Sequence, residues 1–248
     1  MKYIDSHAHI LSEYYDDLEE VIEKSSDTLV IINGVNLDSN YEILKLVKNN
    51  VNLYGALGIH PSEVPNCDLK DLDNIETNLN NEKIIAVGET GLDLYWDKTH
   101  FDKQVEFFKK HIELSIKYNK PLIIHSRNAE EEIYEILKEY KNLKFIMHCY
   151  GGSLELAKKF IELGGLIGIG GVVTFKNAKD LQSIVKGIEL DCLITETDSP
   201  YLAPEPNRGK KNEPGNIKYI VKKIAEIKGL SEEEVKHKIY NNFMRQFD

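Results

Sequence analysis

Cysteine is scarce in this sequence, and the few cysteines it has are far apart. They are Cys67, Cys149 and Cys192, an odd number without Cys-x-x-Cys spacing, which argues against a disulfide framework and against a cysteine zinc site. The chain also lacks an apolar signal segment near its first residue and any run of about 18 apolar residues that could cross a bilayer. We therefore expect an unprocessed protein of the reducing cytoplasm with no membrane contact.

Positive charge is also in deficit. Lys and Arg number 31 against 41 Asp and Glu, so the formal net charge is −10. Because proteins hold nucleic acid largely by neutralising its phosphates, this balance argues against a generally basic binding surface, and a polyanionic substrate would need the help of bound cations. The rest of the composition, 42% hydrophobic and 29% charged, is typical of a globular protein.

Short β-branched runs alternate with longer amphipathic runs along the whole chain. Strands are predicted at residues 3–9, 28–34, 53–60, 84–89, 122–125, 145–149, 166–170 and 193–198. Helices are predicted at residues 16–26, 38–50, 68–80, 100–119, 128–141, 153–164, 178–188, 215–229 and 232–247. The alternation and the length of 248 residues predict one domain over residues 1–248, an α/β chain folded as a single (β/α)8 TIM barrel with an extra C-terminal helix.

Local signals mark several element boundaries. Asp38 and Ser153 are predicted helix N-caps, and Ser231 followed by Glu234 has the spacing of a capping box. The proline-rich segment 200–215 follows the eighth predicted strand. It could be an interdomain linker, but too little chain follows it for a second core, and we expect a loop over the active site.

Six potential metal ligands lie at the ends of separate predicted strands. They are His7, His9, Glu89, His125, His148 and Asp198. Because the carboxyl ends of the strands of a parallel barrel meet at one face, the pattern predicts one metal-centred active site there. A mixed histidine and carboxylate set suits Zn, Mn or Co ions, whereas Mg prefers oxygen ligands and water, so the identity of the divalent ions stays open.

Residue parity supports this reading at the first and last strands. Asp5, His7 and His9 share one face of the first strand, and an outward polar trio would face apolar helices. His7 and His9 can then bind one ion, while Asp5, one layer deeper, could hold a ligand imidazole in its correct tautomer. Asp198 would lie beside them when the barrel closes and could accept a proton from a bound water. Glu196 is interpreted as a supporting residue rather than a ligand.

Substrate contacts are expected from the loops around the same rim. His60, Arg127 and Arg208 are candidates for binding phosphate, although a supporting hydrogen bond or a solvated surface charge explains each one taken alone. Four aromatic residues follow strand ends and could stack on nucleobases or simply pack the loops. They are Tyr95, Trp96, Tyr150 and Tyr201.

Several motifs occur in a fixed order over nearly the whole chain. They are Ile-Asp-Ser-His-Ala-His at 4–9, Gly-Ile-His-Pro at 58–61, Gly-Glu-Thr-Gly-Leu-Asp at 88–93, Ile-His-Ser-Arg-Asn-Ala at 124–129, Glu-Thr-Asp-Ser-Pro-Tyr-Leu-Ala-Pro at 196–204 and Arg-Gly-Lys-Lys-Asn-Glu-Pro at 208–214. Together they resemble the TatD family of metal-dependent deoxyribonucleases. The resemblance implies a TIM barrel with a two-metal site and carries ligand roles onto the six residues above. Thr90, Leu94 and His111 depart from the family pattern, and we expect these departures to tune substrate choice.

A mechanism and a function follow as hypotheses. His7, His9 and Asp198 would hold one divalent ion, His125 and His148 a second, and Glu89 would bridge the two, with Asp198 as the general base for an activated water. The resemblance implies a phosphodiester hydrolase, a deoxyribonuclease with 3′–5′ exonuclease action on single-stranded or damaged DNA. The alternative is a small-molecule amidohydrolase or lactonase of the same barrel superfamily. A non-catalytic metal-binding protein is disfavoured, because the ligand set is complete.

Overall fold

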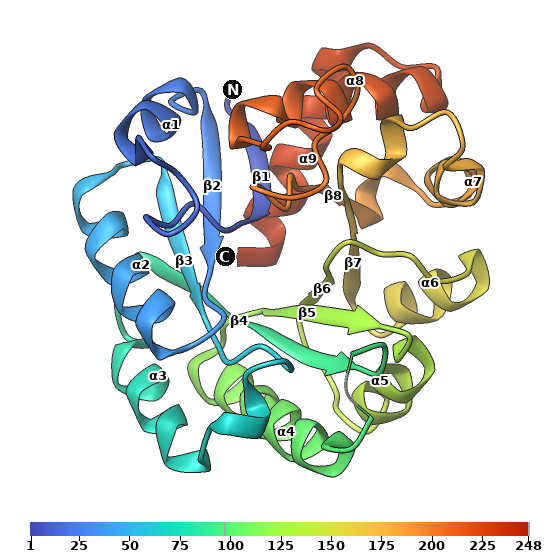
Figure 1. Ribbon diagram of the computed structural model, residues 1–248. Coiled ribbons are helices and arrows are strands. Elements are labelled where there is room, and N and C mark those ends of the chain that lie inside the picture. The colour runs from blue at the N-terminus through green and yellow to red at the C-terminus, as the bar shows by residue number, and fades with distance from the viewer. Residues whose placement is uncertain (97, 248) are drawn as a thin grey trace.

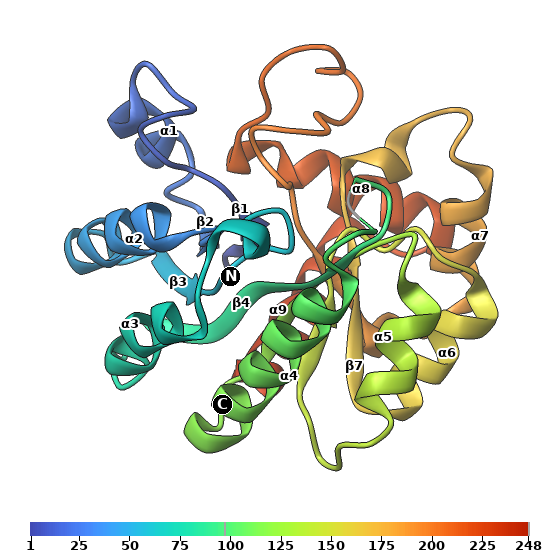
Figure 2. The same cartoon turned by 60° about the horizontal axis from the view of Figure 1, so that its bottom comes forward.

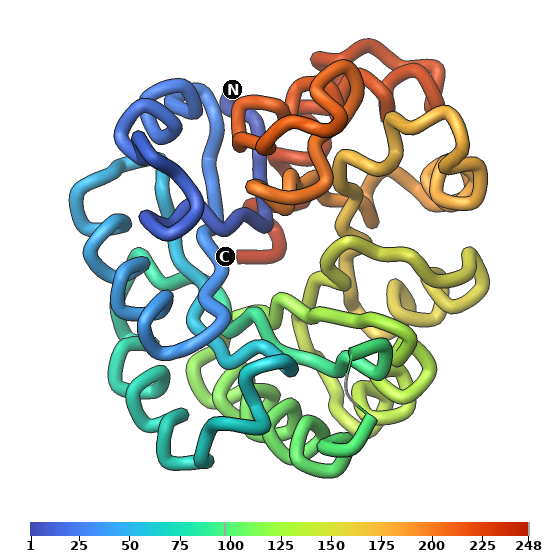
Figure 3. The backbone as a smooth tube through the Cα atoms, viewed as in Figure 1, coloured from blue at the N-terminus to red at the C-terminus, as the bar shows by residue number. Residues whose placement is uncertain are grey.

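Eight parallel strands follow one another in chain order, from β1 to β8, in one sheet. The computed structural model describes residues 1–96 and 98–247. The strands are β1 Tyr3–Ala8, β2 Thr28–Asn33, β3 Leu53–Leu57, β4 Ile84–Asp93, β5 Leu122–Arg127, β6 Phe145–Met147, β7 Gly165–Ile169 and β8 Leu193–Thr195. The smooth tube of Figure 3 passes once around a ring, which brings β8 back beside β1. A bridge between Ala8 and Ser199 and a hydrogen bond from Thr195 Oγ1 to Ile4 O join these two ends.

Helices surround the strands on the outside of the ring (Figure 1). They are α1 Leu18–Lys24, α2 Leu37–Asn49, α3 Leu72–Asn78, α4 Phe101–Tyr118, α5 Glu130–Leu137, α6 Leu154–Glu162, α7 Lys179–Gly187 and α8 Ile217–Lys228. A further helix, α9 Glu232–Phe247, ends the described chain. Short 3-10 helices lie at Val64–Asn66, Leu69–Asp71, Gly171–Thr174, Leu190–Cys192 and Pro214–Asn216. The predicted TIM barrel with an extra C-terminal helix is thereby confirmed.

The extra helix α9 lies at the amino end of the barrel. Asn242 Nδ2 donates to the carbonyls of Leu190 and Leu193, each at 2.8 Å, and Gln246 Nε2 donates to Phe145 O at 2.9 Å. Leu193 and Phe145 are the first residues of β8 and β6. The helix therefore satisfies carbonyls where strands begin, at the end of the barrel opposite to the predicted ligands.

The strands are apolar on both faces because one face fills the barrel and the other packs against helices. Val30, Ile31 and Ile32 are consecutive in β2 and all fully buried. No helix in residues 1–96 and 98–247 has the length and hydropathy needed to span a membrane.

Helix starts match the predicted caps with one exception. Ser153 Oγ accepts from Leu156 N, and Ser231 and Glu234 bond reciprocally, as predicted. At α2, however, Asn36 is the N-cap and forms a capping box with Ser39. Asp38 was predicted there but lies in the first turn, where its carboxylate still complements the helix dipole.

The segment after β8 folds back over the carboxyl end of the barrel. Asn212, fully buried, donates from Nδ2 to Thr197 O at 2.9 Å and to Tyr201 O at 2.8 Å. Tyr15 OH donates to Asn212 O at 2.7 Å, which ties the loop to the chain after β1. Figure 2 shows this loop (orange) standing above the strands. It is a rim loop rather than a linker.

Candidate metal centre

The six predicted ligands converge at the carboxyl end of the barrel. His7 lies in β1, Glu89 in β4 and His125 in β5, while His9, His148 and Asp198 follow β1, β6 and β8. All except His7 line one cavity of about 540 Å³. The arrangement agrees with the strand-end pattern of the sequence, because every ligand sits where an apolar run stops.

The first group of ligand atoms surrounds His7. Its Nε2 lies 3.0 Å from His9 Nε2, 3.3 Å from Glu89 Oε2 and 3.9 Å from Asp198 Oδ1. The His148 ring stacks on the His7 ring at 3.4 Å between centroids, and His148 Nε2 lies 3.8 Å from Asp198 Oδ1. The structure thus places His148 with His7 and Asp198, whereas the sequence hypothesis paired it with His125.

A second group surrounds the other oxygen of Glu89. His125 Nδ1 lies 2.9 Å and His60 Nε2 3.7 Å from Glu89 Oε1. His125 Nε2 lies 3.1 Å from Asp93 Oδ2. Asp93 ends the motif at 88–93, and the sequence pattern alone assigns it no role. Its spacing of four from Glu89 on one strand, which gives the two side chains the same parity, is the signal that could have found it.

Close approach of β4 and β5 makes the second group possible. Gly91 has φ +142°, and a Cβ there would lie 2.0 Å from His125 O. The pairing of β4 with β5 shifts register between Val87 and Thr90, as at a β-bulge. Only glycine fits at position 91, and the irregular strand brings Glu89 and Asp93 to the same imidazole.

The first group has the polar chemistry of a cation site. Donor atoms that share one ion at about 2.0–2.2 Å lie about 3–4 Å apart, which matches the 3.0–3.9 Å separations around His7 Nε2. Burial and the neighbouring His148 hold the pKa of His7 well below its usual range, so the imidazole is neutral and has a lone pair to offer a metal ion. His7 Nδ1 is buried without a hydrogen-bond partner. The residues fit a divalent metal ion.

The field in the cavity favours positive charge. Burial disfavours the imidazolium of His148, but the carboxylates of Glu196 and Asp198 outweigh it and raise the pKa of His148 to about 10. Burial raises the pKa of Asp198 to about 6, against the opposing effect of His148 and His9. For Glu89, the histidines around it overcome burial and keep its pKa well below the usual range.

The two supporting acids lie beneath the ligands. Glu196 Oε2 is 3.2 Å from His148 Nδ1, and its Oε1 accepts from Cys149 N, so it holds the segment that carries His148. Asp5 was expected to orient an imidazole, but it accepts from the amides of His7 and Thr197 and from the Thr197 hydroxyl. It therefore ties β1 to the segment before Asp198.

The three candidates for phosphate binding have different positions. His60 and Arg127 line the cavity. Arg208 instead stacks on Phe175, with Cζ 4.2 Å from the ring centroid, and is not among the described residues that line the cavity. Of the aromatic candidates, Trp96 and Tyr201 line the cavity. Tyr150 is buried, with its ring against Phe160.

Comparisons with known proteins agree with this geometry. The model of the TatD related DNase family matches residues 4–248, and the chain belongs to that family. An uncharacterized metal-dependent hydrolase, YabD, of Bacillus subtilis is 40% identical, with 98% of each chain covered. Another from Methanocaldococcus jannaschii is 38% identical over 100% of this chain and 97% of its own.

A solved structure shows the same fold. The YJJV TatD homolog of Escherichia coli superposes with a TM-score of 0.92 at 27% identity, covering 99% of this chain and 97% of that one. The chain is thus a metal-dependent hydrolase of the TatD family, with histidine and carboxylate clusters able to bind metal.

Proposed function

We propose that the protein is a phosphodiesterase that uses two divalent ions to remove nucleotides from the 3′ end of single-stranded or damaged DNA. The observation that carries this proposal is the division of Glu89 between two ligand groups. Its Oε2 faces His7 and His9, at 3.3 and 3.5 Å, while its Oε1 faces His125 and His60, at 2.9 and 3.7 Å. A carboxylate shared in this way suits a bridge between two ions.

The residues around Glu89 have separate proposed roles in hydrolysis. His7, His9, His148 and Asp198 would hold one ion, and His125 with Asp93 or His60 the other. Bound divalent ions lower the pKa of water and neutralise charge on a phosphoryl group. Asp198 faces the cavity and accepts the proton that the attacking water gives up. Arg127 faces the same cavity and binds a phosphate oxygen of the substrate.

The walls of the cavity support an unpaired strand end as substrate. Tyr14 and Tyr201 line the cavity with their rings 6.0 Å apart, and Trp96 and Arg127 line it with the guanidinium carbon 5.2 Å from the indole centroid. A volume of about 540 Å³ is within the usual range for a small-molecule site. A base inside a duplex would have to leave its stack to enter, which an unpaired or damaged end does at less cost.

Cleavage of labelled single-stranded DNA by metal-loaded protein tests the proposal. Strands labelled at the 5′ end should give a ladder of products shortened from the 3′ end. His125→Ala should lower turnover by about 10²-fold or more, while His237→Ala, an exposed histidine on α9, should not. Near-normal activity in metal-stripped protein would exclude the mechanism.

The same experiment addresses the alternative substrate class. Amides and lactones are offered in parallel with the DNA at equal metal concentration. Hydrolysis of an amide or lactone without release of any nucleotide would overturn the nuclease proposal in favour of a small-molecule hydrolase.

A further inference from the structure

The turn after β4 presents an exposed aromatic pair beside the candidate metal ligands. Tyr95 and Trp96 are 54% and 70% exposed, and their rings meet edge to face with centroids 4.8 Å apart. Contiguous exposed aromatic surface marks an interaction site more often than exposed apolar residues scattered singly do. Because Trp96 also lines the cavity that holds Glu89 and His125, the pair belongs to the rim of the site.

Asp93 ties the aromatic turn to the ligand cluster. One carboxylate oxygen, Oδ1, accepts from the backbone amides of Tyr95 and Trp96, each at 3.0 Å. The other oxygen, Oδ2, lies 3.1 Å from His125 Nε2. The position of the aromatic rings is therefore coupled through a single side chain to the group that contacts Glu89.

Arg127 completes the cluster from the neighbouring strand. Its Cζ lies 4.1 Å from the Tyr95 centroid and 5.2 Å from the Trp96 centroid. Arg127 supplies the lysine or arginine charge of this cavity, since no other such side chain lines it within residues 1–96 and 98–247. The cavity wall thus combines the π-face of Trp96 with the Arg127 cation, and Tyr95, which is not among the described residues that line the cavity, contacts both.

We propose that Tyr95, Trp96 and Arg127 form a stacking subsite for the unpaired nucleobase next to the phosphate that is hydrolysed. This inference rests on the proposed function and names the substrate feature that the site reads. A ligand that occupies both parts of the cavity needs an anionic group for the metal cluster and a flat face for the aromatic wall, and a nucleotide carries both. Stacking on Trp96 places the base, while Arg127 meets the backbone phosphate.

The composition of the chain supplies a direct probe, because Trp96 is the sole tryptophan. Metal-loaded full-length protein is titrated with phosphorothioate oligothymidylate, which resists hydrolysis, and with an abasic strand of the same length and linkage. Stacking of a base should quench the Trp96 emission strongly, and the abasic strand should quench it far less. Equal quenching by both strands would show that the backbone alone occupies the site and would overturn the proposal.

Kinetics on matched substrates give the second readout. Trp96→Ala should lower kcat/KM on a strand with a normal terminal base by about 5- to 150-fold, the range that base stacking commonly accounts for. The loss on a strand with an abasic terminus should be at least fivefold smaller, and Trp96→Phe should restore most of the normal rate. Equal losses on the two substrates would overturn the subsite.

Tyr41→Ala is the control variant. Tyr41 is 64% exposed and has Lys45 Nζ 4.3 Å from its ring centroid, like the aromatic and cation pair of the proposed subsite, but it lies on α2 away from the cavity. Tyr41→Ala should leave kcat/KM unchanged on both substrates. Thermal melting of each variant checks folding. If the wild-type protein cleaves both strands equally well and Trp96→Ala matches it, the subsite fails and the nuclease stands. If no strand is cleaved, both fall together.

Discussion

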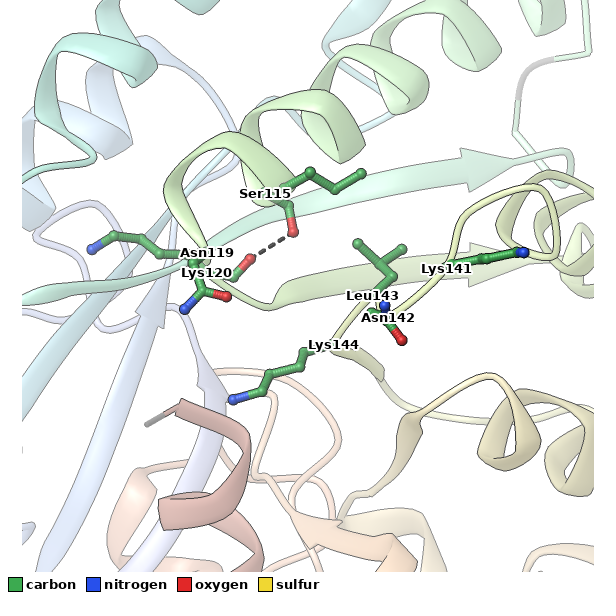
Figure 4. A pocket seen from close by; sticks show the side chains of 8 residues that line it. Ser115, Asn119, Lys120, Lys141, Asn142, Leu143 and Lys144 are labelled. Carbon is green, nitrogen blue, oxygen red and sulfur yellow. Dashed lines mark hydrogen bonds between the residues drawn. The ribbon is translucent and has the colours of Figure 1, made fainter.

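The two ends of the barrel satisfy their polar groups in opposite ways. At the amino end, Lys83 Nζ donates to the carbonyls of residues 50, 51 and 53 at 3.0–3.2 Å, and Lys120 Nζ donates to Ile84 O. Ser115 Oγ donates to Lys120 O at 2.6 Å in the pocket of about 290 Å³ shown in Figure 4. Cations there meet backbone carbonyls of the same chain, and the pocket edge is held by its own hydrogen bonds.

At the carboxyl end, side-chain atoms that could ligate a metal ion lie close to one another. His7 Nε2 and His9 Nε2 are 3.0 Å apart, and His7 Nδ1 is buried without a partner. Such an arrangement lowers the stability of the metal-free chain and is relieved by a bound cation. This fold therefore has its stabilising contacts at one end and its binding chemistry at the other, as TIM barrels generally do.

The sharpest test of this division is Asp198→Asn. Removal of the proposed base should lower kcat by about 10²-fold or more. Burial raises the pKa of Asp198 from its ordinary value to about 6, so the folded state resists ionisation and loses stability as pH rises from 4 through 6. The variant should therefore be more stable at pH 7, without metal, by about 1–3 kcal/mol.

Urea unfolding at pH 7 and pH 4, with turnover measured beside it, checks both effects. Asn also suits the backbone, since residue 198 has φ +55°. The stability gain should fall to a small fraction by pH 4, where Asp198 is protonated in the folded state and about half protonated in the unfolded chain. A variant that loses stability at pH 7 would contradict the idea that this end is built at the expense of stability.

Return of metal to stripped protein should stabilise the wild-type chain. A free metal concentration of 100 times Kd adds about 2.7 kcal/mol to the free energy of unfolding, and thermal melting measures it as a rise in Tm. His148→Ala should show a smaller rise, because its ring stacks on His7 and its Nε2 faces Asp198. An equal rise in both proteins would place the ion elsewhere.

At the amino end, Asn242→Ala should have the opposite effects to Asp198→Asn: a loss of stability without a loss of turnover. The change leaves the buried carbonyl of Leu193 and the partly buried carbonyl of Leu190 without the Asn242 donor. We expect a loss of about 1–3 kcal/mol in the free energy of unfolding with kcat per folded molecule unchanged. Asn241→Ala, at the exposed neighbouring position, is the control and should change neither the free energy of unfolding nor kcat. Loss of kcat in Asn242→Ala would break the proposed separation of the two ends.

Much of the barrel could be predicted from the sequence because its signals are local. An apolar run that stops at a histidine or carboxylate predicts both a strand and the end of it that faces the site. The positions of His125 and His148 at strand ends therefore follow from the sequence. The first residue of a helix is less well determined by the local sequence than the end of a strand is. Asn36 and Asp38 are both good capping residues, and only the backbone conformation decides between them.

The remainder depends on how strands sit against one another. The approach of Asp93 to His125 needs the register shift around Gly91, and periodicity does not reveal a shift of that kind. The stacking of His148 on His7 depends likewise on barrel closure. Arg208 lies on a long loop, where the preference of its guanidinium for Phe175 over the cavity is a tertiary effect.

The smallest effect on stability is expected from His111, a residue that also shows where prediction from the sequence fails. His111 departs from the family pattern, and its sequence position predicts a role in substrate choice. It is instead fully buried in α4, where Nε2 accepts from Ile59 N and Nδ1 donates to Phe107 O. Burial lowers its pKa to about 4. In the unfolded chain the imidazole takes up a proton near pH 6.5, so stability is complete above that pH and falls between pH 6.5 and 4.

His111→Gln should remove this part of the acid sensitivity, because an amide can make both hydrogen bonds without titrating. The wild-type protein loses about 2 kcal/mol from this group between pH 7 and pH 5, and the variant should lose less by about that amount. Urea unfolding of both metal-free proteins at the two pH values measures the difference. Equal losses would mean that folding does not lower the pKa of His111, and a changed substrate preference at pH 7 would return His111 to the site.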